Sequence, residues 1–510
     1  MVKNYLSMLK REFFGYNLSK LIRDLLAGLT VAAVALPLAL AFGVSSGADA
    51  AAGLITAIIA GIVISAFSGA SFQISGPTGA MSAILIGIVA AHGLNAVFFV
   101  SFIAGVILLI CGIFRLGKLV ALIPRPVITG FTSGIAVIIA LGQIDNFFGT
   151  VSEGSSAVEK LGSYFRLGFK PHLFTLLLGL IVVAVMLIWP KKWNAKVPSS
   201  LVGIIVSTVV YLIFRFEGVA TVGEIPRTLF PEARFSFAAI DFSSIGDLLP
   251  SAITVAALGM IESLLCGASA SRMKNEPFNA DIELIAQGAG NILIPFFGGV
   301  PATAAIARTS VAIKSGAQTR LTGIFHALWL LVVMFLLGGV MKLIPLSALG
   351  GVLIVTAWRM NEWDAIRNIF GKKFVGAIIQ FLVTMIATVV FDLTVAIIIG
   401  IAVSLVIFAV NAAKLRAEIT EDEDHAAHVG ITGIVFFADA KALENAAASL
   451  PECERVIFDL QGVISIDLTG VETLEEICED LHTRGKTVTL TGMSDAVEKV
   501  CRQSGLAEKF

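Results

Sequence analysis

The chain has 510 residues, of which 57% are hydrophobic and only 14% are charged, and its mean hydropathy is +0.91. Soluble globular domains carry about 25% charged residues, so this composition excludes a soluble protein and indicates a chain built mainly of membrane spans. Residues 412–510 carry 9 Lys and Arg against 19 Asp and Glu, whereas the preceding part carries 27 against 18. We therefore expect an N-terminal segment (1–24), a basic membrane domain (25–411) and an acidic C-terminal domain (412–510).

Fourteen apolar segments approach the roughly 20 residues that a membrane-spanning helix needs. The N-terminal residues before the first apolar segment include several Lys and Arg and no small-residue cleavage site. They are predicted to form a cytosolic segment before the first span. Lys and Arg are more frequent in the connecting stretches on the same side of the membrane as the N-terminus than in those on the other side. This distribution predicts an even number of spans and two cytoplasmic termini. The segments are residues 25–44, 51–68, 77–91, 95–114, 120–143, 172–189, 199–214, 246–267, 280–295, 302–313, 320–340, 345–358, 374–390 and 393–411.

The third segment is interrupted at its start, in the sequence SFQISGPTGAMSAI (71–84). Gly76 and Pro77 precede Thr78, Gly79 and Ala80, and a helix from Thr78 to Ala91 would be only about 21 Å long. This is too short for a hydrocarbon core of about 30 Å. The pattern predicts a half-helix whose N-terminus lies inside the membrane.

The tenth segment repeats this design in FFGGVPATAAIART (296–309). Two glycines and a proline precede the small residues Ala302, Thr303, Ala304 and Ala305, and one arginine, Arg308, follows. A helix from Thr303 to Lys314 would be about 18 Å long. An ordinary span with a Gly/Pro kink, whose arginine reaches the membrane surface, is the alternative interpretation.

The two interruptions fall at the third position of two successive sets of seven segments. Because seven is odd, the second set would cross the membrane upside down, and the two half-helices would meet N-terminus to N-terminus near the midplane. Helix N-termini present free N–H groups and a positive dipole end, so this arrangement predicts an anion site. We expect Gly79 and Ala304 to face a water-filled cavity there.

Glu262, in ITVAALGMIESLLCG, is the only carboxylate well inside a segment. An intramembrane carboxylate indicates function, although a structural hydrogen bond to a neighbouring helix is the alternative. Asp281, Glu283 and Asp392 lie near predicted ends and are expected to be solvated. The polar residues Gln73 and Gln287 lie near the interruptions, where they could satisfy freed backbone groups or contact a substrate.

From about residue 412 the periodicity changes. An acidic stretch, EITEDEDHAAH, is expected to be a linker, and strands then alternate with helices from HVGITGIVFFADA to SDAVEKVCRQSGL. This alternation predicts a small cytosolic α/β domain. No phosphate loop, metal-ligand cluster or nucleophile–base pattern occurs, so we expect no enzyme, no metal, no cofactor and no nucleic-acid partner.

The blocks ALPLALAFGV (35–44), ISGPTGAMSA (74–83), ELIAQGAGNILIPFFGGVPATAAIART (283–309) and GIFHA (323–327) resemble the sulfate permease (SulP) anion transporters, the family related to prestin and pendrin. The C-terminal part resembles a STAS domain. The resemblance implies an all-α membrane domain of 14 spans as a seven-plus-seven inverted repeat, like that of uracil permease, divided into core and gate domains and assembled as a homodimer. In IDLTG (466–470), Leu468 stands where soluble STAS relatives carry a phosphorylated serine.

The resemblance also implies roles for residues. Arg308 matches a basic residue beside the bound anion in the tenth span, and Glu262 matches an acidic position of the eighth span implicated in proton or cation coupling. Spans 1, 3, 8 and 10 line the implied site. The expected substrate-binding residues are Pro37, Gln73, Thr78, Gly79, Ala80, Ala302, Thr303, Ala304, Ala305 and Arg308.

The predicted function is secondary active transport of a small anion, such as sulfate, bicarbonate, chloride or a dicarboxylate, by alternating access. A proton or sodium ion is the expected co-substrate, and a bacterial inner membrane is the expected location. Alternatives are an anion channel, a non-transporting voltage-responsive protein, or a nucleobase permease of the same fold.

Overall fold

The computed structural model describes residues 2–118, 123–154, 157–190, 193, 197–236, 245–391, 393–412, 415–422, 425–436 and 440–509. The chain divides into two compact units, Met1–Ile401 and Ala402–Phe510. The start of the expected segment 120–143 and residue Asp392 lie outside the described residues.

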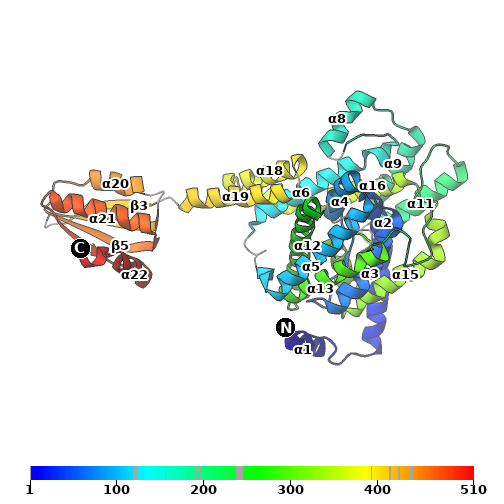
Figure 1. The fold of residues 1–510 in the computed structure, drawn as a ribbon, viewed down its shortest axis with the longest axis horizontal. Coiled ribbons are helices and arrows are strands. Elements are labelled where there is room, and N and C mark those ends of the chain that lie inside the picture. Colours follow the sequence, from blue (N-terminus) through cyan, green and yellow to red (C-terminus); the bar gives the residue numbers. More distant parts are fainter. Residues whose placement is uncertain are drawn as a thin grey trace. The chain divides into compact units, whose positions relative to one another are not determined.

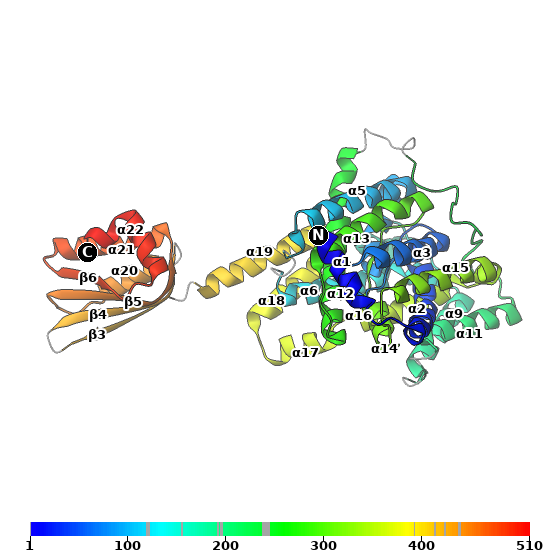
Figure 2. The same cartoon turned by 90° about the horizontal axis from the view of Figure 1, so that it is seen from below.

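Each of the fourteen apolar segments contains a helix (Figure 1, Figure 2). Among the described residues, six helices are long and apolar enough to cross a membrane, and several shorter apolar helices accompany them. The fourteen are α2 (Leu18–Ser45), α3 (Ala50–Phe67), α4 (Gly79–His92), α5 (Leu94–Ile113), α6 (Arg125–Gly142), α9 (Leu173–Ile188), α11 (Ser199–Phe214), α12 (Ile245–Lys274), α13 (Ala280–Leu293), α14 (Ile306–Lys314), α15 (Leu321–Met341), α16 (Leu346–Met360), α18 (Val375–Val390) and α19 (Leu393–Ala412). Connecting helices include α1 (Val2–Glu12), α7 (Ile144–Phe148), α8 (Ala157–Leu167), η4 (Ile294–Phe297) and α17 (Trp363–Gly371).

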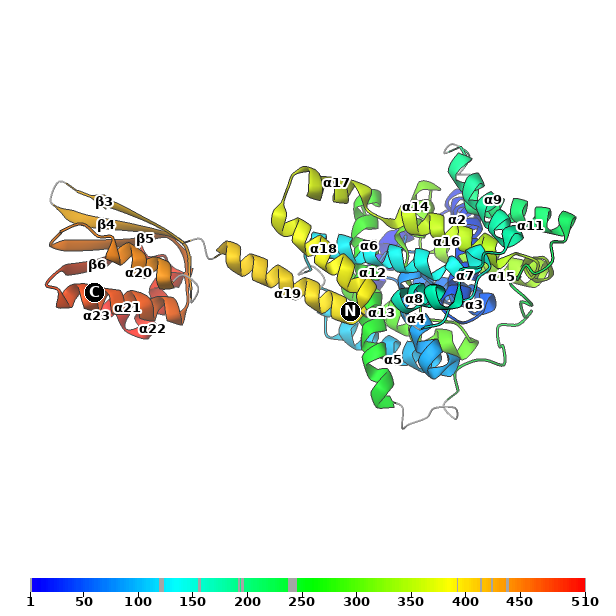
Figure 3. The same cartoon turned by 90° about the horizontal axis from the view of Figure 1, so that it is seen from above.

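The packing of these helices follows the predicted repeat. Helix α5 packs on α13, and its counterpart α15 packs on α3; likewise α2 packs on α15 and α12 on α5. A second group repeats the pattern, with α6 on α18 (Figure 3) and α16 on α9. We call α2–α5 and α12–α15 the core helices, and α6, α9, α11, α16, α18 and α19 the gate helices.

Glycine allows two core helices to approach backbone to backbone. A Cβ atom added to Gly105 of α5 would lie 2.9 Å from the carbonyl oxygen of Gly288 in α13, and one on Gly288 would lie 2.5 Å from the backbone nitrogen of Leu109. Close packing through small residues is a main source of helix association in a bilayer, where apolar burial supplies little.

The two interruptions are joined by a short antiparallel ladder. Strand β1 (Ser75–Gly76) pairs with strand β2 (Thr303–Ala304), with Ser75 opposite Ala304 and Gly76 opposite Thr303. Helix α4 begins close to its predicted start. The predicted start of the second half-helix at Thr303 is wrong, because the backbone of Thr303 and Ala304 pairs with β1, and α14 begins only at Ile306.

The C-terminal unit is a four-stranded sheet with the order β3-β4-β5-β6 (Figure 2). Strand β3 pairs antiparallel with β4, and the other two pairings are parallel with intervening helices, which confirms the predicted α/β domain. Strand β3 and the first residues of β4 overlap the stretch expected to be a linker (418–428), so that expectation is wrong there. The acidic side chains of β3 face outward, while Ala417 and Ile419 pack on the core. The elements are β3 (Arg416–Glu421), β4 (Ala426–Val435), α20 (Ala440–Ala448), β5 (Arg455–Ile466), α21 (Leu468–Thr483), β6 (Thr487–Thr491), α22 (Asp495–Ser504) and α23 (Leu506–Lys509).

Candidate functional site

Arg308 lies at the crossing of the two interruptions and is 1% exposed. Its Nη2 atom donates to the carbonyl oxygen of Pro77, 2.5 Å away, so its side chain reaches from α14 to the segment that precedes α4. Its Nη1 atom is buried without a hydrogen-bond partner among the described residues. A buried cation with a free donor is a suitable counter-charge for an anion.

Gly76 leaves the space that the guanidinium group occupies. A Cβ atom at this position would lie 2.4 Å from Nη1 of Arg308. A larger residue here would therefore displace the guanidinium group, which lies directly against the backbone of strand β1.

Glu262 of α12 contacts both interruptions. Its Oε2 atom accepts hydrogen bonds from the hydroxyl groups of Thr78, at 2.9 Å, and Thr303, at 2.6 Å, and these two hydroxyls are 3.3 Å apart. Glu262 is partly exposed, whereas Thr303 is fully buried. In this arrangement both hydroxyl donors are directed at the carboxylate.

The N-termini of the two short helices have no side-chain caps. Thr78 is the N-cap residue of α4 and Ala305 that of α14, and neither side chain accepts a hydrogen bond from the first turn. The first N–H groups of a helix have no partner within it, so uncapped ends can bind an oxyanion through the backbone.

Gly79 does not face a water-filled cavity, and that expectation is wrong. A Cβ atom on Gly79 would lie 2.2 Å from Cδ1 of Ile139 and 3.1 Å from Cε1 of Phe42. Helix α6, a gate helix, therefore packs directly over the N-terminus of α4. Ala304, at 2% exposed, is enclosed as well.

A cavity of about 780 Å³ lies on the His92 side of α4. Core helices α4 and α12 and gate helices α6 and α18 supply most of its lining, which includes Ser82 and Ile139. Ser82 lies in the first turn of α4. The cavity therefore reaches the first turn of this half-helix, and Ile139 lies between it and Gly79.

The other predicted site residues are held in structural contacts. The side-chain amide of Gln73 donates to the carbonyl oxygen of Ser263, 2.7 Å away, and the backbone nitrogen of Ala305 donates to Ile74. Pro37 is buried within α2, a helix that packs on both α4 and α14. Ala80 is buried in the first turn of α4.

Ala302 is fixed by a residue that the sequence analysis missed, Asn291 of α13. The Asn291 side chain accepts from the backbone nitrogen of Ala302 at 2.8 Å and donates to its carbonyl oxygen at 2.9 Å. Ser263, beside Glu262, was missed too: its hydroxyl accepts from the backbone nitrogen of Ala304 at 3.2 Å.

Glu283 is fully buried, so the expectation that it is solvated is wrong. It accepts hydrogen bonds from the hydroxyl of Ser68, the backbone nitrogen of Gly69 and the side-chain amide of Gln287. The sequence held a signal: Glu283, Gln287 and Asn291 recur every four residues and so form one polar stripe on α13.

Within the part of the chain that the structure describes, no three His, Cys, Asp or Glu side chains are placed to hold a metal ion. The polar groups that meet at the crossing instead combine one cation, one carboxylate, two hydroxyls and two uncapped helix ends. This set can bind a small anion and hold a proton or a cation on the carboxylate.

Comparison with known proteins gives two family matches. The model of the Sulfate permease family matches residues 21–387, and the model of the STAS domain matches residues 398–510. The Putative sulfate transporter YvdB of Bacillus subtilis is 34% identical over 527 residues, which cover 98% of this chain and 96% of that protein.

Solved structures also resemble this one, among them two that differ in identity and in coverage. The transmembrane domain of a cyanobacterium bicarbonate transporter, BicA, is 30% identical, with a TM-score of 0.69 over 75% of this chain and 98% of that one. The overall structure of SLC26A9 is 18% identical, with a TM-score of 0.82 over 99% of this chain and 89% of that one, a likeness of fold.

Proposed function

Because the chain belongs to the sulfate permease family, we propose that it is a secondary active transporter that carries a small anion, such as sulfate or bicarbonate, by alternating access. Two relatives support these two anions, one described as a putative sulfate transporter and the other as a bicarbonate transporter. Chloride and dicarboxylates would suit the same site.

The observation that carries this proposal is the free Nη1 donor of Arg308, buried beside two uncapped helix N-termini. Each helix end contributes only about half a positive charge, so a midplane anion needs a further cation. A guanidinium group remains protonated at physiological pH and supplies a fixed charge. The anion would thus bind between Arg308 and the first turns of α4 and α14.

Glu262 would couple transport to a proton or sodium ion. In the present arrangement both threonine hydroxyls donate to its carboxylate. Protonation of the carboxylate, or a cation bound to it, would weaken those hydrogen bonds and free the hydroxyls of Thr78 and Thr303 for the anion. Binding of the cation and binding of the anion would then favour each other.

We further propose that the core helices carry the site past the gate helices, with Ile139 closing the path from the cavity on the His92 side. The proposed organisation is a cytosolic segment (1–24), a transport domain (25–411) and a STAS domain (412–510) with cytoplasmic termini. A homodimer in the bacterial inner membrane is the proposed assembly.

Reconstitution in liposomes tests the proposal. Vesicles are challenged with labelled sulfate, bicarbonate, chloride and a dicarboxylate while proton and sodium gradients are imposed separately. Arg308→Ala should abolish uptake, whereas Arg166→Ala, which removes an exposed partner of Glu153, should leave it unchanged. Wild-type affinity in Arg308→Ala would exclude this arginine from the site, and passive equilibration without accumulation would indicate a channel.

Glu262→Gln tests the coupling. This variant mimics the protonated carboxyl group, so it should retain anion binding and lose the response of uptake to the coupling gradient. Intact gradient-driven accumulation in Glu262→Gln would leave the carboxylate with a structural role alone.

A further inference from the structure

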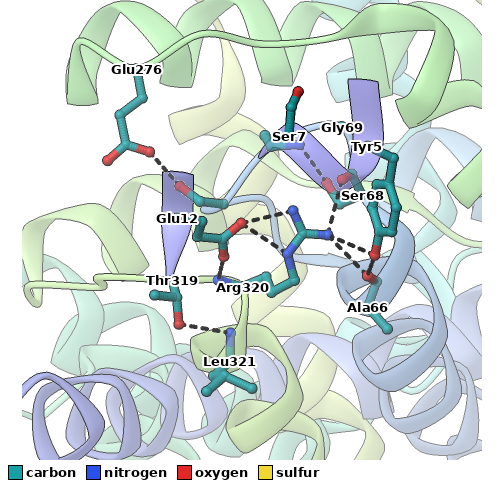
Figure 4. Close-up of polar contacts among 12 residues, drawn as sticks. Tyr5, Ser7, Glu12, Ala66, Ser68, Gly69, Glu276, Thr319, Arg320 and Leu321 are labelled. Atoms are coloured by element: carbon teal, nitrogen blue, oxygen red, sulfur yellow. Dashed lines mark hydrogen bonds and ion pairs between the residues drawn. The ribbon is translucent and has the colours of Figure 1, made fainter. Parts of the chain in front are cut away.

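A buried ion pair joins the N-terminal helix α1 to the start of helix α15 (Figure 4). The carboxylate of Glu12 accepts three hydrogen bonds from Arg320: from the backbone nitrogen at 2.6 Å, from Nε at 3.0 Å and from Nη2 at 2.8 Å. The two side chains are 4% and 6% exposed. Nε and Nη2 both donate to Oε2 while the backbone nitrogen donates to Oε1, and these charge-assisted hydrogen bonds hold the guanidinium group in one orientation.

The remaining edge of the guanidinium group holds the end of α3. Its Nη1 atom donates to the carbonyl oxygens of Ala66, at 2.9 Å, and Ser68, at 3.3 Å. Tyr5 of α1 donates its hydroxyl to the same Ala66 oxygen, and its ring lies 5.3 Å from the guanidinium carbon (Figure 4). The end of α3, the start of α15 and helix α1 therefore meet at Arg320.

A chain of buried hydrogen bonds continues from this point to the anion site. The hydroxyl of Ser68 donates to Oε2 of Glu283 at 2.6 Å. The side-chain amide of Gln287 donates to Oε1 of Glu283 and to the hydroxyl of Ser75, each at 2.8 Å. Ser75 belongs to strand β1 and pairs with Ala304 of β2. The side chains of Ser68, Glu283, Gln287 and Ser75 are each at most 1% exposed, so water does not replace these hydrogen bonds.

The segment that follows α14 is held at the same place. Arg320 ends the loop after this helix, and the backbone nitrogens of Gln318 and Thr319 in that loop donate to Asp24 of α2, at 2.7 and 3.1 Å. The chain entering α4 is thus linked to the Glu12–Arg320 pair through these hydrogen bonds, and the chain leaving α14 is held next to that pair.

We propose that Glu12 is a positioning residue for the anion site: through Arg320 and the hydrogen-bonded chain from Ser68 to Ser75, the N-terminal helix sets the placement of strand β1 and helix α14. The inference rests on the proposed anion transport for its functional readout. By this inference the N-terminal segment affects the affinity for the substrate as well as preceding the first span.

Glu12→Gln tests this role, because it removes the charge and keeps the size of the side chain. In liposomes, the half-saturating concentration of sulfate or bicarbonate should rise at least about fivefold, with a smaller change in maximal rate per folded protein. Tyr5→Phe, which removes one hydroxyl of the cluster, should give a smaller rise, and Glu12→Asp should lie between wild type and Glu12→Gln. Glu153→Gln, in an exposed ion pair, is the matched control and should change neither value.

A second readout does not need transport. A cysteine introduced at Ala307, an exposed position of α14, should be alkylated at a different rate in Glu12→Gln than in the parent variant, and at an unchanged rate in Glu153→Gln. Wild-type half-saturation and alkylation in both Glu12→Gln and Tyr5→Phe would overturn the inference. A lower yield of folded Glu12→Gln protein, with wild-type half-saturation in the protein that does fold, would overturn it as well. If the wild type carries no anion, the proposed transport fails, and the alkylation rates alone decide this inference.

Discussion

At the scale of single residues, the contact between Gly76 and Arg308 gives a sharp test of the site. The Cβ atom of Gly76→Ala would lie 2.4 Å from Nη1 of Arg308, so the guanidinium group must move. We expect the half-saturating anion concentration in liposomes to rise about tenfold, which corresponds to about 1.4 kcal/mol of lost binding free energy.

Gly162→Ala is the control for this substitution, because a Cβ atom there meets nothing within 4 Å. It should transport like the wild type. Unchanged anion affinity in Gly76→Ala, at normal protein levels, would mean that the present position of Arg308 is not the one that binds the anion.

Cys478 provides a residue-scale test in the C-terminal unit. Burial, with smaller contributions from Glu475 and Glu479, raises the pKa of this thiol to about 12 from its ordinary 9.0. The neutral thiol is favoured in the folded state, so its contribution to stability is complete below pH 9.0 and is lost as the pH rises towards about 12. At pH 8, mass spectrometry after treatment with N-ethylmaleimide should find Cys478 unmodified until denaturant is added.

The half-buried Cys453 is the internal control for that measurement and should react first. Thiolate is the reactive form of cysteine, so burial and a raised pKa act in the same direction. Modification of Cys478 as fast as Cys453 in the native protein would contradict the packing of α21 against the sheet.

At the scale of elements, Asn291 connects helix α13 to the approach of strand β2. Asn291→Ala would leave the backbone nitrogen and carbonyl oxygen of Ala302 buried without these partners, at a cost of about 1–3 kcal/mol for each unsatisfied group. We expect a lower thermal unfolding temperature in detergent and weaker anion binding. Asn368→Ala, an exposed change on α17, should alter neither quantity. Equal unfolding temperatures for the two variants would show that β2 does not depend on Asn291.

The helices of the membrane unit could be predicted from the sequence because hydropathy is a local property, readable in each window of the chain. The start of α14 could not be. Thr303 and Ala304 leave the helix to pair with β1, more than two hundred residues earlier, and no local pattern specifies such a partner. Glu283 was misplaced for the same reason, since its burial depends on Ser68 and Gly69, which come from a distant segment.

The site shows the same division. Small residues before a lone arginine led to Arg308 and an intramembrane carboxylate led to Glu262; the structure places both at the crossing, and their part in transport stays a prediction. The packing of Ile139 over Gly79 was not predictable, because it depends on where a gate helix stands against a core helix.

At the scale of the whole molecule, the four-stranded unit has a hydrophobic core of its own, formed by β4, β5, α21 and their neighbours. Removal of residues 415–510 should therefore lower expression, assembly or transport rate and leave the choice of anion unchanged. The measurements are size-exclusion chromatography of the purified variant and its ratio of sulfate to bicarbonate uptake. A truncated protein produced normally but with a different preferred anion would contradict this separation.

The two-residue ladder between β1 and β2 also bears on how such a protein can acquire a new substrate. Its pairing is made by main-chain atoms, which every residue type except proline can supply in full. A side chain of similar size can thus replace Thr303 or Ala304 without breaking the main-chain pairing of the crossing, while a residue without a hydroxyl at position 303 loses the hydrogen bond to Glu262. A library restricted to these two positions, with Gly76 and Arg308 kept, would search ion preference on a constant scaffold. Mutation could therefore change the side chains beside Arg308 while the backbone of the crossing stays the same.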